Sequence, residues 1–378
     1  MGESMKKTLA RACTINAPCK INLHLAIGER RPDGFHELES LFVPLDFHDT
    51  LRFECGGKDG DCSLEMNWEA EAVQSVIPPV IPFEKNLVTR AVSLFREASG
   101  LKSGLTIRLD KRVPVGAGLG GGSSDAASCL LALNSLAGEA LPMEELKKIA
   151  AVLGSDVPFF LGTDRIVCPQ DTVCPSAAFV SGRGELVKPV KTPQGLWVLL
   201  VKPGFYSDTA EAFQLLDQAR EQMREAKTSL LAWEKPPIDV IIKSLEGAPE
   251  TWPFYNDFLP VFLNSHNPKD LTTEEDKQGK FTTEDTEFYT ENTEEYVGTR
   301  RFKINSFLGK AEQYRAILTT LKEAGASFSG LSGAGSCCFG IFKAKETAEQ
   351  AEKKIRKPGN FVKLTFFLAQ KSIPVLEY

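Results

Sequence analysis

Strict alternation of apolar and polar positions near the start of the chain predicts a strand from Lys20 to Ile27. The apolar positions, which would share one buried face, are Ile21, Leu23, Leu25 and Ile27. Lys20 and Asn22 would project together from the opposite face, because successive side chains of a strand point to opposite sides. A turn at 31–34 is expected to follow.

Later segments alternate between helical periodicity and short apolar runs. The predicted helices lie at 86–98, 123–137, 143–153, 209–224, around 238–245, around 307–321 and at 347–354. The predicted strands lie at 41–45, 51–54, 104–110, 196–201, 337–342 and 361–368. The polar, turn-rich stretch 56–82 is predicted to be loop, and 155–160 a short apolar turn or helix with Asp156 in its first turn. This mixture favours an α+β fold.

A domain boundary is predicted near 184–193, which divides the chain into 1–186 and 187–378. The stretch 264–301 is dense in Thr, Glu and Asp and has few apolar residues. Such a segment buries too little surface to offset its ordering entropy, so it is predicted to be a mobile acidic insertion. A second insertion is expected at about 163–176.

The charge, the apolar runs and the cysteine spacing together disfavour three kinds of partner: nucleic acid, membranes and metal ions. The 378 residues carry a net charge of −6 and no basic stripe, which disfavours nucleic acid. The apolar runs are too short to span a bilayer and the start of the chain lacks the apolar core of a signal peptide, so a cytoplasmic protein without a membrane partner is expected. The nine cysteines are scattered and lack zinc-knuckle spacing, so no metal site is predicted. The sequence makes no prediction of oligomeric state.

The stretch Val113–Asp125 holds five glycines between Gly116 and Gly122 and then two serines. Glycine lets a ligand approach the backbone N–H groups closely, and a helix starting near Ser123 would aim its free N–H groups into the loop. Together these features favour an anion cradle, most often one for a nucleotide phosphate. The alternative is a flexible linker or a tight turn.

Two familiar phosphate loops do not fit. Gly116–Gly121 matches the G-x-G-x-x-G pattern, but a second predicted helix follows where a dinucleotide fold needs a strand. A Walker loop is excluded because no G-x-x-x-x-G-K-[ST] occurs. The loop would therefore cradle phosphate without a lysine of its own.

Phosphoryl transfer from a nucleotide would need a positive charge and a carboxylate near the acceptor hydroxyl. Lys20 is the candidate for the charge, the alternative being an ordinary solvated lysine. Asp156 is the candidate carboxylate, the alternative being a helix cap. Spacing decides neither case.

Taken in order, the motifs of the chain resemble those of the GHMP kinases, which include galactokinase and the homoserine, mevalonate and phosphomevalonate kinases. The matching segments are Ala17–Leu23, Arg31–His36, Pro114–Ala126, Gly154–Phe159 and Ser329–Ser336. The first two are most similar to a branch that phosphorylates the 2-hydroxyl of cytidine-diphosphate methylerythritol in the non-mevalonate route to isoprenoid precursors. The resemblance implies an N-terminal α/β domain with a left-handed βαβ element, a ferredoxin-like C-terminal domain and a cleft between them.

The resemblance also assigns roles. Lys20 and Asp156 would be the catalytic pair, and Asn86 would lie near the adenine of ATP. The residues expected to wrap the ATP phosphates are Pro114, Val115, Gly116, Ala117, Gly118, Leu119, Gly120, Gly121, Gly122, Ser123 and Ser124. The residues expected to hold the small-molecule substrate are Asn22, Phe35, His36, Thr209 and Gly333, with the cytosine stacked on Phe35 and hydrogen-bonded by His36. Mg²⁺ would arrive with ATP, and no protein ligand for it is identified.

Two positions depart from the family pattern. Cys19 stands where alanine is usual, which raises the question of thiol reactivity beside Lys20, and Phe35 replaces a tyrosine. Two other functions stay open at this point. One is another GHMP-type kinase, of the mevalonate or homoserine class, and the other is a non-catalytic nucleotide-binding module.

Overall fold

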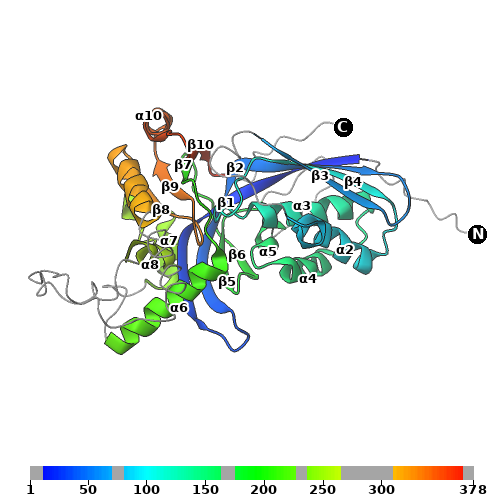
Figure 1. Cartoon of the computed structure of the whole chain (residues 1–378), viewed down its shortest axis with the longest axis horizontal. Helices are drawn as coiled ribbons and strands as arrows, with labels where there is room; N and C mark the ends of the chain where they lie inside the picture. Colours follow the sequence, from blue (N-terminus) through cyan, green and yellow to red (C-terminus); the bar gives the residue numbers. More distant parts are fainter. Residues whose placement is uncertain (1–11, 70–80, 163–174, 227–235, 265–309, 369–378) are drawn as a thin grey trace, which may run out of the picture.

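The structure, a computed structural model, describes residues 12–69, 81–162, 175–226, 236–264 and 310–368. In these residues the chain forms a six-stranded and a four-stranded sheet, with helices packed on both (Figure 1). Both predicted insertions fall largely or wholly outside the described residues. No helix in the described part of the chain is long and apolar enough to cross a membrane.

The first sheet has the strand order β3-β4-β2-β5-β6, with β1 paired to β2. The strands are β1 (Ala12–Arg30), β2 (His36–Cys55), β3 (Cys62–Trp68), β4 (Leu105–Lys111), β5 (Ala178–Gly182) and β6 (Leu186–Pro189). The β1–β2 hairpin projects beyond the rest of the sheet (Figure 1). β3 and β4 are parallel and are joined through η1 (Phe83–Lys85) and α2 (Leu87–Ser99), which makes a βαβ element.

Two predictions for this sheet are wrong. The expected strands 41–45 and 51–54 are parts of the single strand β2. The expected gap at 46–50 is bridged by β1, which pairs Pro18 with His48 and Ala17 with Asp49. The predicted loop 56–82 contains β3, whose residues alternate between half-buried and exposed.

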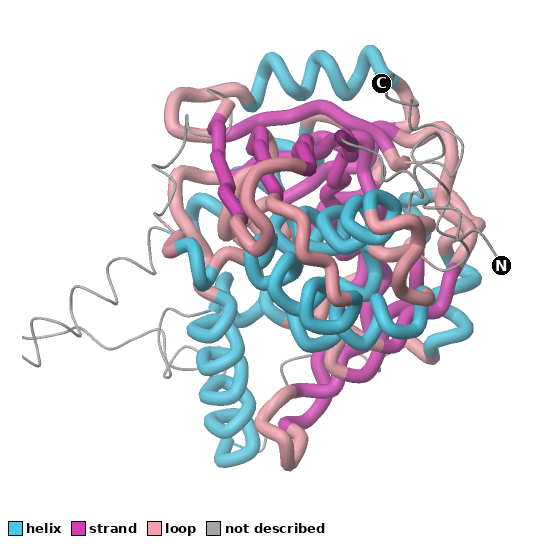
Figure 2. Tube along the Cα trace, turned by 90° about the vertical axis from the view of Figure 1, so that its right-hand side faces the viewer, coloured by secondary structure: helices cyan, strands magenta, loops and turns pink. Residues whose placement is uncertain are grey.

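Helices cover one face of the first sheet. These are α2, α3 (Gly121–Leu136), α4 (Met143–Leu153) and α5 (Val157–Phe160). In Figure 2 they lie in front of the strands. α3 is buried along almost its whole length, including Ala126, Cys129, Leu130 and Leu133. It is therefore the central helix of this layer, and its N-terminus receives the glycine-rich loop.

The second sheet is antiparallel, with the order β10-β7-β9-β8. Its strands are β7 (Trp197–Lys202), β8 (Phe328–Leu331), β9 (Cys338–Phe342) and β10 (Phe361–Phe366). The helices of this half are α6 (Thr209–Ala226), α7 (Ile238–Ser244), α8 (Phe258–Asn264), residues 310–323 and α10 (Lys345–Ile355), with η2 (Pro249–Thr251) between α7 and α8. Numbered by their place along this half of the chain, the strands β7, β8, β9 and β10 are the first to the fourth, so the order in the sheet is 4-1-3-2. Helices follow the first and the third strand, which is the ferredoxin-like arrangement that the resemblance implied.

The two sheets share an apolar core. One buried cluster joins Ile21 and Leu41 of the first sheet to Leu200, Phe339 and Phe361 of the second. The chain passes from the first sheet to the second between the end of β6 and the start of β7, so the predicted boundary at 186/187 falls at β6. The halves therefore pack into one body at the level of β1 and β2.

Candidate active site

A cleft of about 390 Å³ opens where the two halves meet. It is lined by the glycine loop, β1, and the starts of α2, α3, α5 and α6. Most of the residues expected to bind ligands line it, namely Lys20, Asn22, Asn86, Pro114 through Ser123, Asp156, Thr209 and Gly333. Ser124, Phe35 and His36 do not.

The glycine loop (Val113–Gly122) takes a conformation that needs its glycines. Gly116, Gly118 and Gly120 have φ of 60°, 72° and 70°, in the left-handed region. A Cβ on Gly118 would lie 2.0 Å from the carbonyl oxygen of Ser332. Gly120 is the N-cap of α3, and no side chain caps this helix. The first N–H groups of α3 therefore face the cleft at its positive dipole end, which suits an anion.

Lys20 is held at the floor of the cleft. It lies between two β-bulges of β1, of the kind that re-aims side chains beside functional sites, and is only 3% exposed. Its Nζ donates to Asn22 Oδ1 at 2.6 Å and to the Gly118 carbonyl at 3.1 Å, and lies 3.4 Å from Asp156 Oδ2. The reading of Lys20 as a solvated surface lysine is therefore wrong.

Asp156 precedes α5, where the sequence allowed it to be a helix cap. Its side chain makes no capping hydrogen bond. Instead the carboxylate, 30% exposed, faces the ammonium of Lys20 across the cleft. The structure thus brings together two residues that lie far apart in the sequence, one from the first strand and one from the turn before α5.

The end of the cleft beside α2 is lined by residues that the sequence analysis missed. Met66 and Trp68 of β3 line it, and Asn86 Nδ2 contacts Met66 Sδ at 3.2 Å while Asn86 Oδ1 caps Val88 N–H. The signal was present, since residues 62–68 alternate perfectly, but the surrounding polar stretch masked it.

Beneath the glycine loop lies a buried charged cluster that was also missed. Lys111 bonds to Asp49 and, at 2.7 Å, to Asp125 Oδ2. Asp49 Oδ1 also accepts from the backbone N–H groups of Arg112 and Val113, at 2.6 and 2.8 Å. The cluster therefore fixes both the entry of the loop and the first turn of α3.

The charges of this cluster are unbalanced, with two carboxyls to one ammonium. Burial raises the pKa of Asp125 to about 8, and the Asp49 carboxylate adds to this shift against the opposing effect of Lys111. Burial lowers the pKa of Lys111, but the two carboxyls outweigh it and raise the pKa above its usual range. The raised pKa favours a proton bound within the cluster, and with that proton the two carboxyls and the ammonium carry no net charge.

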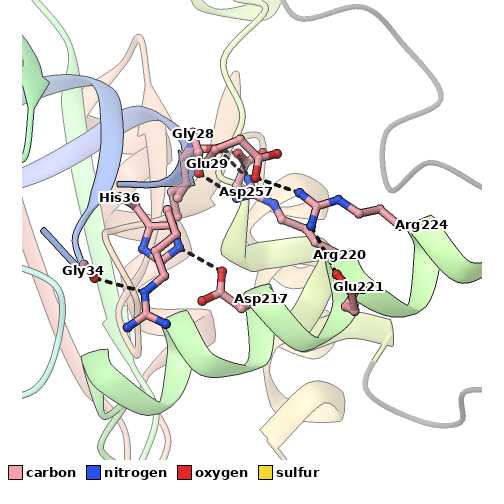
Figure 3. Close-up of polar contacts among 11 residues, drawn as sticks. Gly28, Glu29, Gly34, His36, Asp217, Arg220, Glu221, Arg224 and Asp257 are labelled. Atoms are coloured by element: carbon pink, nitrogen blue, oxygen red, sulfur yellow. Dashed lines mark hydrogen bonds and ion pairs between the residues drawn. The ribbon is translucent and has the colours of Figure 1, made fainter. Parts of the chain in front are cut away.

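His36 and Phe35 lie beside the cleft rather than on its wall. His36 stacks on Phe213, which does line the cleft, and its Nε2 lies 2.8 Å from Asp217 Oδ1 (Figure 3). Phe35 is 48% exposed and lies under the guanidinium of Arg183. Their assigned contact with cytosine stays a prediction.

The hairpin that carries these two residues is fixed to α6. Arg220 donates to the carbonyls of Ile27 and Gly28 and pairs with the buried Asp257, while Arg224 pairs with Glu29 (Figure 3). Because α6 also supplies Thr209 and Phe213, these contacts set the width of that end of the cleft.

Comparison with known proteins gives consistent results. Residues 86–163 match the GHMP kinases N terminal domain and 310–360 match GHMP kinases C terminal. A 4-diphosphocytidyl-2-C-methyl-D-erythritol kinase of Thermodesulfovibrio yellowstonii is 33% identical over 90% of this chain and 93% of its own length. The protein of that name from Nitratidesulfovibrio vulgaris is 31% identical over 91% and 95%.

Solved structures of kinases are also similar to this chain. A crystal structure of 4-(cytidine 5'-diphospho)-2C-methyl-D-erythritol kinase superposes with a TM-score of 0.58 at 26% identity, covering 93% of this chain and 98% of that one. A homoserine kinase from Cytophaga hutchinsonii, at 16% identity and a TM-score of 0.54 over 97% of both chains, shares the fold. On these matches the chain is a kinase of the GHMP family and belongs to its 4-diphosphocytidyl-2-C-methyl-D-erythritol kinases.

Proposed function

We propose that this kinase transfers the γ-phosphoryl group of ATP to the 2-hydroxyl of 4-diphosphocytidyl-2-C-methyl-D-erythritol. The observation that carries the proposal is the position of Lys20 and Asp156, 3.4 Å apart, beside the open N-terminus of α3. An anion cradle, a buried ammonium and a free carboxylate are the parts that phosphoryl transfer to an alcohol requires.

In the proposed reaction the glycine loop and the first turn of α3 bind the phosphates of ATP. Asp156 accepts or orients the proton of the acceptor hydroxyl. Lys20, 3.4 Å from Asp156, orients its carboxylate and stabilises the charge that develops on the transferred group. The carboxylate of Asp156 and the hydroxyl of Ser123, which line the cleft, are oxygen donors of the kind that Mg²⁺ accepts. Mg²⁺ delivered with ATP would further neutralise the phosphates.

For the acceptor, we propose that the cytidine end binds beside the hairpin and α6. Asn22, Thr209 and Gly333 line the cleft there, and Phe35 and His36 stand at its edge. Phe213 of α6 also lines the cleft, and its ring stacks on that of His36. An apolar pocket with a few polar groups suits a nucleobase.

The direct test is an ATP-consumption assay with 4-diphosphocytidyl-2-C-methyl-D-erythritol, with mevalonate and homoserine as competing acceptors. Phosphorylation of the cytidine compound alone is expected. Preferred turnover of mevalonate or homoserine would move the chain to another GHMP class, and tight ATP binding without transfer would indicate a non-catalytic module.

The roles of the pair are tested by Lys20→Ala and Asp156→Asn. Each is expected to lower kcat by at least ~10²-fold, because each removes a group that acts on the transferred charge or proton. Lys147→Ala, which removes an exposed lysine of α4, is the control. Circular dichroism and thermal unfolding confirm that each variant is folded. A near-normal rate in either variant would remove that residue from the mechanism.

A further inference from the structure

A serine from the second half of the chain connects the structures that hold Lys20. Ser332 follows β8 in the second glycine-rich loop (Ser329–Ser336) and is fully buried. Its hydroxyl donates to the Gly118 carbonyl at 2.8 Å and accepts from the Asn22 backbone N–H at 3.2 Å. One hydroxyl thus joins the C-terminal half to both β1 and the glycine loop.

The two groups that Ser332 contacts belong to the two residues that hold the Lys20 ammonium. Lys20 Nζ donates to the side chain of Asn22 and to the carbonyl of Gly118. An ammonium has three N–H donors in a fixed tetrahedral arrangement. Two of them are committed, and Nζ also lies 3.4 Å from Asp156 Oδ2 and 4.4 Å from the centroid of the Phe42 ring. The orientation of the charge therefore depends on where the Gly118 carbonyl points.

The Gly118 carbonyl needs a second anchor. Gly118 has φ of 72°, in the left-handed region that glycine adopts most readily, so no side chain of its own holds its carbonyl in place. Ser332 is itself rigidly placed, because its N–H donates to the Cys337 carbonyl at 2.9 Å and Asn256 Nδ2 donates to the carbonyls on either side, Leu331 and Gly333, at 2.8 and 2.9 Å. The hydroxyl is therefore a fixed donor to the carbonyl that also accepts from Lys20.

We propose that Ser332 is a positioning residue for phosphoryl transfer, which locks the Gly118 carbonyl and thereby aims the Lys20 ammonium at Asp156. The inference rests on the proposed function, since it assigns Ser332 a part in the same reaction. Ser332 acts through Lys20 and does not touch the reacting atoms. Its loss should reduce the rate of transfer more than the binding of either substrate.

The test compares Ser332→Ala with Ser336→Ala. Ser336 is also a fully buried serine of the second glycine-rich loop, but its hydroxyl bonds to the Phe205 carbonyl at 2.8 Å and lies at 3.4 Å from Gly116 O, away from Lys20. We expect Ser332→Ala to lower kcat by roughly 10- to 100-fold, with KM for both substrates changed less than threefold. Ser336→Ala should lower the melting temperature comparably and kcat by less than threefold. Equal losses of kcat would overturn the proposal.

A double-mutant cycle separates positioning from general support. In a Lys20→Met background, where there is no ammonium to aim, Ser332→Ala should reduce the residual rate by less than twofold. The same 10- to 100-fold loss in both backgrounds would show that Ser332 acts independently of Lys20. Ser332→Cys, which fills the space but donates weakly, covers the case in which the alanine variant does not fold. An intermediate kcat is expected for it, and a wild-type kcat would contradict the proposal.

Failure of the proposed role of Ser332 can be told apart from failure of the proposed function. If the wild-type protein does not phosphorylate the cytidine compound, the proposed substrate is wrong. If the wild type turns over and Ser332→Ala matches Ser336→Ala, only the role of Ser332 is lost.

Discussion

The two glycine-rich loops have similar compositions and different surroundings. The first, Val113–Gly122, lines the cleft and leads into an uncapped helix. The second, Ser329–Ser336, packs against it and reaches the cleft only at Gly333 and Ala334 among its described residues, while Ser332 and Ser336 are fully buried. The N–H groups of Ser336 and Cys337 donate to the carbonyls of Gly116 and Ala117. Glycine therefore serves two purposes here. In the first loop it leaves the backbone N–H groups at the start of α3 open to the cleft, and where the loops meet it lets the two backbones approach closely.

The largest expected effect comes from breaking the contact between the loops. Gly118→Ala would place a methyl group 2.0 Å from Ser332 O at a residue with positive φ, so the loops must separate. We expect kcat/KM to fall by more than ~10²-fold, since displacements of about 1 Å have effects of this size. Steady-state kinetics and thermal unfolding, which should show a lower melting temperature, measure the loss.

Gly122→Ala is the matched substitution on the ligand side of the first loop. Its Cβ would meet Leu87 Cδ1 at 3.8 Å, an ordinary contact, and Gly122 lies inside α3. The melting temperature should hold or rise, because alanine favours a helix by up to about 1 kcal/mol over glycine. Any loss should appear as a raised KM for ATP. Equal destabilisation by the two variants would mean that the loops do not differ in the way described.

A buried carboxyl group lies below the first loop and a buried amino group lies beside the second. The two groups should therefore make the free energy of unfolding depend on pH in opposite directions. Below the first loop, burial raises the pKa of Asp125 to about 8. Beside the second loop, burial lowers the pKa of Lys202 to about 8, and its Nζ donates to the carbonyls of Pro203 and Phe205. For Asp125 the folded state binds more protons than the unfolded state between about pH 4 and 8. Its contribution to the free energy of unfolding therefore falls as pH rises through that range.

For Lys202 the folded state binds fewer protons between about pH 8 and 10.5, so its contribution rises with pH there. In the wild type, the free energy of unfolding should fall with pH below pH 8 because of Asp125 and rise with pH above pH 8 because of Lys202. Asp125→Asn should remove the fall and Lys202→Met the rise, each at most about 1.4 kcal/mol per pH unit. Urea unfolding from pH 6 to 10 tests both. Variants whose profiles run parallel to that of the wild type would contradict the assignment.

The smallest expected effect concerns the cysteines between the loops. Cys19 and Cys337 are fully buried, and burial is the main cause that raises the pKa of both thiols, Cys337 to about 12. Both should resist alkylation at pH 8, because the thiolate is the reactive form. Mass spectrometry after labelling of the native and denatured protein measures this. Rapid native labelling of Cys337 would show that the loops open apart in solution.

The sequence predicts those elements best whose packing is local. The helix at Met143–Leu153 has the predicted bounds because its periodicity and the following Gly154 mark them. The prediction ended one strand at residue 45 and began the next at residue 51, whereas β1 pairs with β2 across that gap, His48 with Pro18 and Asp49 with Ala17. Such pairing depends on another strand, so no local pattern within β2 marks it.

The site divides in the same way. The glycine loop follows from a local pattern, whereas Lys20 and Asp156 were candidates that local patterns left undecided and to which the family motifs assign roles. Ser332, Asp49 and Phe213 carry no local mark, since their roles come from contacts with residues distant in sequence. The bond between Ser332 and Asn22 spans 310 positions.

That separation has a consequence for the order in which the protein is made. The first glycine loop and α3 can pack on β1 and β2 early, but the anchor at Ser332 is synthesised after most of the chain has left the ribosome. A nascent chain would hold a phosphate cradle before it holds an aimed Lys20. The hydrogen bonds that join the two halves beside Lys20 can therefore form only after the second glycine-rich loop has been synthesised.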